Sequence, residues 1–371
     1  MTRRRSALRR IVVKVGSALI ADAERGPDPA RIGPLVADLA ALHAGGLEVT
    51  LVTSGAIAAG TARLGLRTRP RSIPEKQAAA AVGQAALMWH YEQAFEPHGQ
   101  RVAQVLLTQE DISHRARYLN ARNTLLTLLR YRVVPIVNEN DTVAVEEIKV
   151  GDNDNLAALV AHLVEADLLV LLSDIDGLYT GDPRHDTDAH RIERVEAITP
   201  EMERRAGGEG ALGTGGMVTK LQAAQKAMAA GIPMIIADGR RPGVLRALAR
   251  GESVGTYFAP RTDRLAARKR WIGFALPPQG VLDVDAGARR ALVERGKSLL
   301  PSGVVKVEGS FQAGDCVGLR DPEGREFARG IVGLDAREAE LLRGAKTAEI
   351  ERRLGYRVAD EVIHRDDLVL L

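Results

Sequence analysis

The run RIVVKVGSALI, residues 10–20, has the pattern that decides the expected fold: an apolar strand that contains one lysine and ends in a glycine turn. Strands that are apolar nearly throughout are typical of parallel sheets whose two faces are covered by helices. Helix-like segments that end in glycine, such as 29–46, alternate with these strands. The alternation predicts an α/β fold, a mostly parallel sheet sandwiched by helices. The other strand-like runs of this kind are 48–54, 101–107, 132–138, 166–173 and 232–238.

The pattern of apolar and polar residues changes after the basic stretch 261–270. Beyond it, short alternating runs separated by glycines predict a small β-rich, barrel-like domain. A chain of 371 residues is long enough for two domains. We therefore expect a first domain at 1–262, a linker at 263–279 and a second domain at 280–371.

The composition predicts a protein of a reducing, aqueous compartment. The chain has one cysteine, Cys316, so it cannot form an internal disulfide. Lys14 interrupts the apolar run that imitates an export signal, and no run approaches the ~18–20 apolar residues that cross a bilayer. We therefore expect a cytoplasmic protein that makes no membrane contact. The eight histidines show no metal-binding spacing, so no metal ligand within the protein is predicted.

Two of the expected strands end in residues suited to an anionic ligand. In open α/β sheets, ligands bind beyond the carboxyl ends of the strands. Lys14 stands beside the Gly16–Ser17 turn, where a lysine can hold a phosphate; the alternative is an edge lysine that reaches solvent. Ser54 and Gly55 end the run 48–54, where backbone amides could bind an anion; the alternative is a simple helix cap.

A glycine-rich stretch, 207–216, leads into a helix that carries Lys220. The window 208–213 matches G-x-G-x-x-G, but the segment before it, 199–206, reads as a helix, so a dinucleotide-binding motif is rejected. Lys220 follows Thr219, which excludes the Walker A order. We interpret the glycine loop and its lysine as a clamp over phosphates.

The stretch NENDTVAVEEIKVGDNDNLAA, residues 138–158, contains two knots of Asn and Asp. Asp141 and Asn153 stand in different knots, about 40 Å apart if the chain between them were extended. A fold-back of that chain would bring both knots into one pocket, where carboxylate and amide oxygens suit an ammonium group. The alternative is that these residues are only turn formers and helix caps.

Five motifs, in this order, resemble those of the glutamate 5-kinase family of the amino acid kinase superfamily. They are VVKVGSALI (12–20), VTSGAIAAG (52–60), the 138–158 stretch, LLSDIDGLYTGDPR (171–184) and ALGTGGMVTK (211–220). The resemblance extends from about residue 10 to the C-terminal LGYRVADEVIHRDDLVLL (354–371). It implies the amino acid kinase fold followed by a PUA domain.

The resemblance implies transfer of the γ-phosphoryl of ATP to the side-chain carboxylate of L-glutamate. The product, L-glutamyl 5-phosphate, is the first intermediate of proline biosynthesis. Lys14 and Lys220 then correspond to the catalytic lysines that hold ATP and the transferring phosphoryl, and Asp154 to the acid that organises them. Ser173 stands where many relatives have threonine and keeps the hydroxyl. The glutamate-binding positions correspond to Ser54, Asp141 and Asn153, and the ATP-binding positions to Lys14, Ser173, Asp174, Thr214, Gly215, Gly216, Met217, Val218, Thr219 and Lys220.

The same resemblance implies Mg²⁺ as the partner of ATP, a homo-oligomer, and feedback inhibition by proline. The nearest alternative is another activity of the superfamily, with aspartate, acetylglutamate or UMP as the acceptor. A second alternative is an RNA-binding protein that acts through the PUA domain. Residues 279–371 carry 15 Lys and Arg against 17 Asp and Glu, which is not the positive footprint that phosphate backbones require. Nucleic acid is therefore not expected as a partner.

Overall fold

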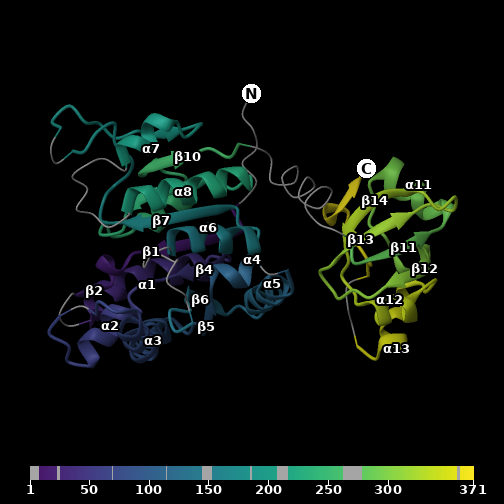
Figure 1. The fold of residues 1–371 in the computed structure, drawn as a ribbon, viewed down its shortest axis with the longest axis horizontal. Coiled ribbons are helices and arrows are strands. Elements are labelled where there is room, and N and C mark those ends of the chain that lie inside the picture. Colours follow the sequence, from purple (N-terminus) through teal and green to yellow (C-terminus); the bar gives the residue numbers. More distant parts are fainter. Residues whose placement is uncertain are drawn as a thin grey trace. The chain divides into compact units, whose positions relative to one another are not determined.

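The structure of the protein is a computed structural model. It describes residues 8–22, 26–68, 70–113, 115–143, 153–183, 186–206, 216–261, 278–356 and 360–371. The chain divides into two compact units, residues 1–261 and 262–371 (Figure 1). The predicted linker, 263–279, lies outside the described residues except for its last two positions.

The first unit is built on an eight-stranded sheet, counted over its described residues. Six of the strands are parallel to their neighbours, and each coincides with one of the six predicted runs, so the predicted fold class is confirmed. β10 (Thr256–Phe258) pairs antiparallel with β9, and β8 (Arg194–Val195) pairs with β10. Across the sheet, the six parallel strands are β5 (Val102–Leu107), β6 (Val134–Glu139), β4 (Glu48–Val52), β1 (Arg10–Val15), β7 (Leu168–Ser173) and β9 (Met234–Asp238).

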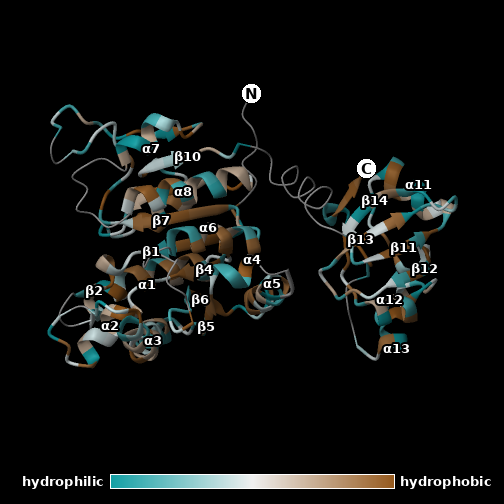
Figure 2. Cartoon of the chain, in the orientation of Figure 1, coloured by the Kyte–Doolittle hydropathy of each residue, from teal (hydrophilic) through white to brown (hydrophobic). Residues whose placement is uncertain are grey.

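Helices cover both faces of this sheet, and each face has its own apolar core. Ile11, Val13 and Val15 of β1 pack with α1 (Pro29–Ala44), α3 (Ile73–Phe95) and α9 (Val244–Ala249). Val12 packs with α5 (Arg115–Arg130), α6 (Asn153–Leu163) and α8 (Gly216–Ala229). Figure 2 shows β7 as a hydrophobic band. Because side chains alternate along a strand, Lys14 lies on the face of Val12, toward α6 and α8.

A close helix crossing holds the loop after β4. α2 (Ala56–Arg63) lies against α3, and the two backbones meet at glycines. A Cβ on Gly60 would lie 1.7 Å from the carbonyl oxygen of Ala79, and one on Gly83 would lie 1.8 Å from that of Ala56. Only glycine permits this approach, which ties the start of α2, just after Ser54, to the middle of α3.

The second unit has a strand-rich fold with its own core. β11 (Gly280–Val284) is parallel to β13 (Cys316–Arg320), and the other pairings of its five-stranded sheet are antiparallel. Cys316 is buried in this sheet. The elements are β11 (Gly280–Val284), α11 (Ala286–Arg295), β12 (Val304–Gly309), β13 (Cys316–Arg320), β14 (Glu326–Ile331), α12 (Ala336–Leu342), α13 (Ile350–Leu354) and β15 (Leu368–Leu370).

The remaining elements of the first unit are short. The helix predicted before the glycine-rich stretch is present as α7, which removes the strand that a dinucleotide motif would need. Over the described residues, none of the helices combines the length and apolarity that a membrane span requires. These short elements are β2 (Ala21–Asp22), β3 (Gly26–Pro27), α4 (Gln109–Ser113) and α7 (Pro200–Ala206).

Candidate active site

The predicted site residues gather at the carboxyl ends of the parallel strands. β1 lies between β4 and β7. After β1 the chain forms β4 and the strands on one side of it, and it later adds β7 on the other side. Such a switch point is where open α/β sheets bind ligands. Lys14 is near the end of β1, Ser54 follows β4, Asp141 follows β6 and Ser173 ends β7.

A buried cluster of three charges lies beside the end of β1. Lys14 Nζ is 2.5 Å from Asp154 Oδ1, and Lys220 Nζ is 3.1 Å from Asp154 Oδ2. The exposed fractions are 6% for Lys14, 2% for Asp154 and 8% for Lys220. The interpretation of Lys14 as an edge lysine is wrong, because β1 is a central strand and the ammonium is buried in this cluster. Two ammonium groups against one carboxylate leave the cluster with a net positive charge.

Asp154 is ionised in this setting. Burial favours its protonated form, but the charges and hydrogen bonds of Lys14 and Lys220 outweigh burial and hold the pKa of Asp154 below its ordinary value. The hydroxyl of Thr219 also donates to Asp154 Oδ2, at 2.9 Å. Asp154 stands in the first turn of α6, and both Thr219 and Lys220 stand near the start of α8. The carboxylate therefore joins α6 and α8 to β1.

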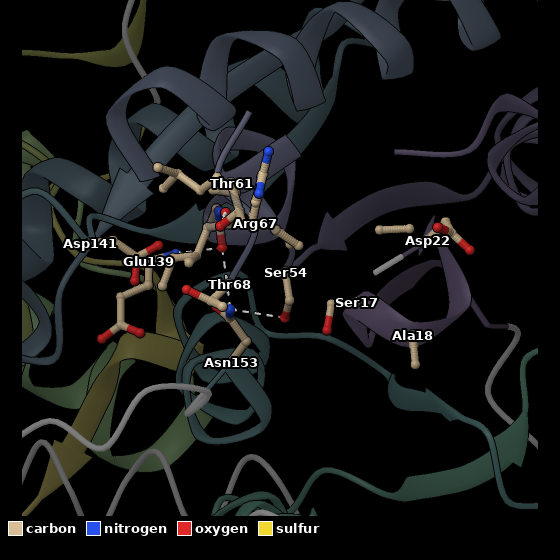
Figure 3. Close-up of a pocket in the computed structure, with 17 residues that line it drawn as sticks. Ser17, Ala18, Asp22, Ser54, Thr61, Arg67, Thr68, Glu139, Asp141 and Asn153 are labelled. Atoms are coloured by element: carbon tan, nitrogen blue, oxygen red, sulfur yellow. Dashed lines mark hydrogen bonds between the residues drawn. The ribbon is translucent and has the colours of Figure 1, made fainter. Parts of the chain in front are cut away.

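A cavity of about 610 Å³ opens on the β4–β6 side of β1 (Figure 3). Its walls come from the loops after β1, β4 and β6, from α2 and the segment 66–68 that follows it, and from the start of α6. Asn153, which lines it, directly precedes Asp154, so cavity and charge cluster meet at the first turn of α6. The polar residues of the wall are Ser17, Asp22, Ser54, Thr61, Arg67, Thr68, Asn138, Glu139, Asp141 and Asn153.

Hydrogen bonds join the two Asn/Asp knots across this cavity. Asn153 Nδ2 donates to Ser54 Oγ at 3.0 Å and to Asn138 Oδ1 at 3.2 Å. The interpretation of Ser54 as a helix cap is wrong: Gly55 is the N-cap residue of α2, with φ of 106°, and no side chain caps that end. The hydroxyl of Ser54 is engaged with Asn153 instead. The segment that connects the knots, 144–152, lies outside the described residues.

Asp141 brings a carboxylate to the same wall. Burial raises the pKa of Asp141 to about 6, because a carboxylate loses hydration there. A cationic group in the cavity would restore the ionised form, since an opposite charge close to a carboxylate lowers its pKa. The electrostatics of this position therefore suit a positively charged ligand group.

Of the predicted nucleotide residues that the structure describes, Ser173 and Asp174 lie on the other side of β1. The hydroxyl of Ser173, at the end of β7, donates to Asp174 Oδ1 at 3.1 Å, and Asp174 is exposed. None of the seventeen residues that line the cavity belongs to this group. Thr214 and Gly215 lie outside the described residues. The first turns of α8 hold Gly216, Met217, Val218, Thr219 and Lys220.

Comparisons with known proteins bear on the fold and the family of the chain. The family model described as "Amino acid kinase family" matches residues 9–238, and that of the PUA domain matches residues 280–354. The glutamate 5-kinase of Geobacter sp. (strain M21) is 53% identical over 365 residues, which cover 98% of each chain. That of Geobacter sulfurreducens is 53% identical, and that of Moorella thermoacetica is 52% identical, each over 367 residues. These alignments cover 99% of this chain and 98% and 97% of the two relatives.

The chain belongs to the glutamate 5-kinase family. The predicted amino acid kinase fold and the predicted PUA domain are thereby confirmed. This family is a family of kinases, so the chain has a nucleotide substrate. The cluster of Lys14, Asp154 and Lys220 lies between the cavity on one side of β1 and the end of β7 on the other.

Three residues near the cavity of this glutamate 5-kinase family member were not singled out from the sequence. Glu139 and Arg67 line the cavity, and Arg67 is the only Lys or Arg among the seventeen lining residues. Gln84 lies in α3 and is hydrogen-bonded to Asn138 at 2.8 Å. Glu139 sits within the quoted 138–158 stretch, so its position was a usable signal. Arg67 and Gln84 carry no local signal, because only the crossing of α2 and α3 brings them to the site.

Proposed function

We propose that this protein transfers the γ-phosphoryl of ATP to the side-chain carboxylate of L-glutamate and forms L-glutamyl 5-phosphate, the first step of proline biosynthesis. The observation that carries the proposal is the buried cluster Lys14–Asp154–Lys220, which adjoins a cavity lined by amides and carboxylates.

The chemistry requires positioning and charge neutralisation rather than a general base. The side chain of glutamate has a pKa of about 4.3 and is already ionised at neutral pH. Two unit charges about 4 Å apart repel each other by about 4 kcal/mol at an effective dielectric constant of about 20. The two ammonium groups, held by one carboxylate, offset this repulsion between the acceptor and the phosphate chain. The buried position of the lysines strengthens the effect, because little water screens them.

We assign the two sides of β1 to the two substrates. Ser54, Asp141 and Asn153 bind glutamate in the cavity, with Asp141 facing the α-ammonium group. Arg67, the one Lys or Arg among the described residues of the cavity wall, supplies positive charge for the α-carboxylate. On the other side, Ser173 and Asp174 bind the nucleotide, together with Thr214, Gly215 and the start of α8 at 216–220. Lys14 and Lys220 span the junction and hold the transferring phosphoryl.

Mg²⁺ is the metal that we expect to enter with ATP. Within the described ranges, no group of three or more His, Cys, Asp or Glu side chains could hold a metal ion. A site without such a group fits Mg²⁺, which kinases bind largely through substrate phosphates and water. Asp154 is engaged by two lysines, so the phosphates would supply most of the ligands. Bound there, the ion would neutralise part of the phosphate charge.

We further infer a cytoplasmic homo-oligomer that is inhibited by proline, with domains at 1–262 and 280–371 and a linker at 263–279. These inferences rest on the family resemblance and on the change of sequence pattern near residue 261.

The proposed reaction predicts ADP release that depends on glutamate. With MgATP, L-glutamate should be consumed far faster than acetylglutamate or UMP, which lack the free α-ammonium group that Asp141 binds. It should also be consumed faster than aspartate, whose side-chain carboxylate is one methylene closer to the α-carbon and so does not reach the transferring phosphoryl in the same way. Hydroxylamine should trap the acyl phosphate as a hydroxamate, and added proline should slow the reaction. ADP release that is independent of glutamate, or faster with another acceptor, would refute the proposal.

The role of Asp141 predicts that glutamate affinity falls at low pH. The pKa of Asp141 is raised to about 6, so the carboxylate is increasingly protonated below that pH and loses its charge for the ammonium group. The KM for glutamate should therefore rise as pH falls from 7 to 5, while the γ-carboxylate of glutamate stays mostly ionised. Asp141→Asn should raise the KM at pH 7.5 about tenfold or more and change kcat little.

The control for this prediction is the pH profile of Asp141→Asn itself. Because the variant has no titrating group at this position, the rise in KM between pH 7 and 5 should be lost. If the variant keeps the pH dependence of the natural protein, Asp141 is not the group that contacts the ammonium.

A further inference from the structure

A chain of buried amide side chains runs from the cavity into the interior. Gln84 comes from α3, Asn138 from β6 and Asn153 from α6. Asn138 Nδ2 donates to Gln84 Oε1 at 2.8 Å, and Asn153 Nδ2 donates to Asn138 Oδ1 at 3.2 Å. The chain ends at the hydroxyl of Ser54, which accepts from Asn153 Nδ2. Side-chain hydrogen bonds thus link three secondary-structure elements and the loop after β4.

One backbone N–H of β6 reveals the direction of each bond in this chain. The N–H of Glu139 donates to Asn138 Oδ1 at 2.9 Å, and a backbone N–H can only donate. The oxygen of Asn138 must therefore face Glu139 and Asn153, and its nitrogen must face Gln84. Asn153 in turn directs its nitrogen toward Asn138 and Ser54. Its own oxygen, Oδ1, is left over and has no hydrogen-bond partner among the described residues, although it is buried.

That oxygen belongs to a residue of the cavity wall, which Asp141 also lines. An amide oxygen is a good acceptor for an ammonium group and a poor neighbour for a carboxylate. Resting on the function proposed above, we infer that Gln84 is a positioning residue: by accepting from Asn138, it keeps the oxygen of Asn153 available to the α-ammonium of glutamate. Gln84 does not line the cavity and so acts only through Asn138 and Asn153.

The burial of Gln84 supports this role. Its side chain is 9% exposed, and its Nε2 has no hydrogen-bond partner among the described residues. An amide nitrogen buried in this way lowers the free energy of unfolding, so an apolar side chain of the same length would make the protein more stable. The favourable contribution of the amide is the hydrogen bond that Gln84 Oε1 accepts from Asn138. The glycine contact between α2 and α3 at Gly83, the preceding residue, holds this bond in register.

The test compares L-glutamate with glutarate, which has both carboxylates but no amine. Binding of each compound to the full chain is measured by competition in the ADP-release assay. In Gln84→Met the acceptor oxygen is lost at nearly constant length. The preference for glutamate over glutarate should fall about tenfold, with glutarate binding nearly unchanged and kcat changed less than threefold. Gln84→Glu keeps an acceptor oxygen and should retain most of the preference.

Gln93→Met is the matched control, because Gln93 is an exposed residue of the same helix and should leave the preference unchanged. If Gln84→Met does not fold, Gln84→Leu removes the same acceptor from a smaller side chain and must show the same fall. Equal weakening of glutamate and glutarate, or an unchanged preference, overturns the inference. Failure of the natural protein to phosphorylate glutamate overturns the proposed function instead, so the two failures are distinguishable.

Discussion

Lys14→Ala is expected to lower kcat about 10²–10³-fold while changing the KM for glutamate only a few-fold. Lys14 is one of the two cations of the charge cluster and lies at the end of the central strand. It does not line the cavity in which the acceptor binds, so its loss should act on the transferring phosphoryl rather than on glutamate. Steady-state ADP release at varied glutamate and varied ATP concentration measures both constants.

The stability of this variant should hold, because removal of Lys14 leaves Asp154 paired with Lys220. Removal of Asp154 would instead leave two buried ammonium groups facing each other, and breaking a buried pair in this way costs about 3–5 kcal/mol. Lys226→Ala serves as the control, since Lys226 is an exposed lysine of α8 and should leave kcat unchanged. An equal loss in kcat and in glutamate affinity would count against the role assigned to Lys14.

Gly83→Ala is expected to reduce the free energy of unfolding by at least about 3 kcal/mol, or to prevent accumulation of folded protein. The new Cβ would lie 1.8 Å from the carbonyl oxygen of Ala56 and 2.3 Å from the backbone nitrogen of Gly60. Both atoms belong to helix backbone, so no side chain can move aside, and α2 would have to separate from α3. Unfolding in urea, followed by circular dichroism, measures the change.

Gly33→Ala is the matched control for this substitution. Gly33 is also a helical glycine, in α1, but apart from its chain neighbours and its own helix a Cβ there meets no atom within 4 Å. Alanine should therefore change the free energy of unfolding by less than about 1 kcal/mol, because its better helix propensity is set against the restriction that Pro34 places on the residue before it. If both variants change the free energy of unfolding by the same small amount, the close contact of α2 and α3 does not exist in solution.

Any folded Gly83→Ala protein should also bind glutamate weakly. α2 begins directly after Ser54 and Gly55, so a displaced α2 moves the hydroxyl that accepts from Asn153. If a destabilised Gly83→Ala protein binds glutamate as tightly as the natural protein does, other contacts hold the loop after β4.

The sequence by itself determined the parts of this protein that depend on local pattern. The apolar runs predicted all six parallel strands, because a strand buried on both faces must be apolar nearly throughout. The glycine-spaced alternating runs predicted a second, strand-rich unit. Lys14 stood out because a charge inside such a strand is costly unless it is paired. The two Asn/Asp knots stood out because they contain more acceptor groups than one turn needs.

Only the tertiary structure decided which of these residues meet. Ile11 of β1 pairs with Val49 on one side and with Leu168 on the other, and no local pattern encodes that order of strands. The order makes Lys14 central and brings it to Asp154. It also decides that Ser54 bonds to Asn153 instead of capping α2, and that Gln84 reaches Asn138. Hydrophobic pattern reports whether a residue is buried, but its hydrogen-bond partner depends on long-range packing, which a single sequence does not display.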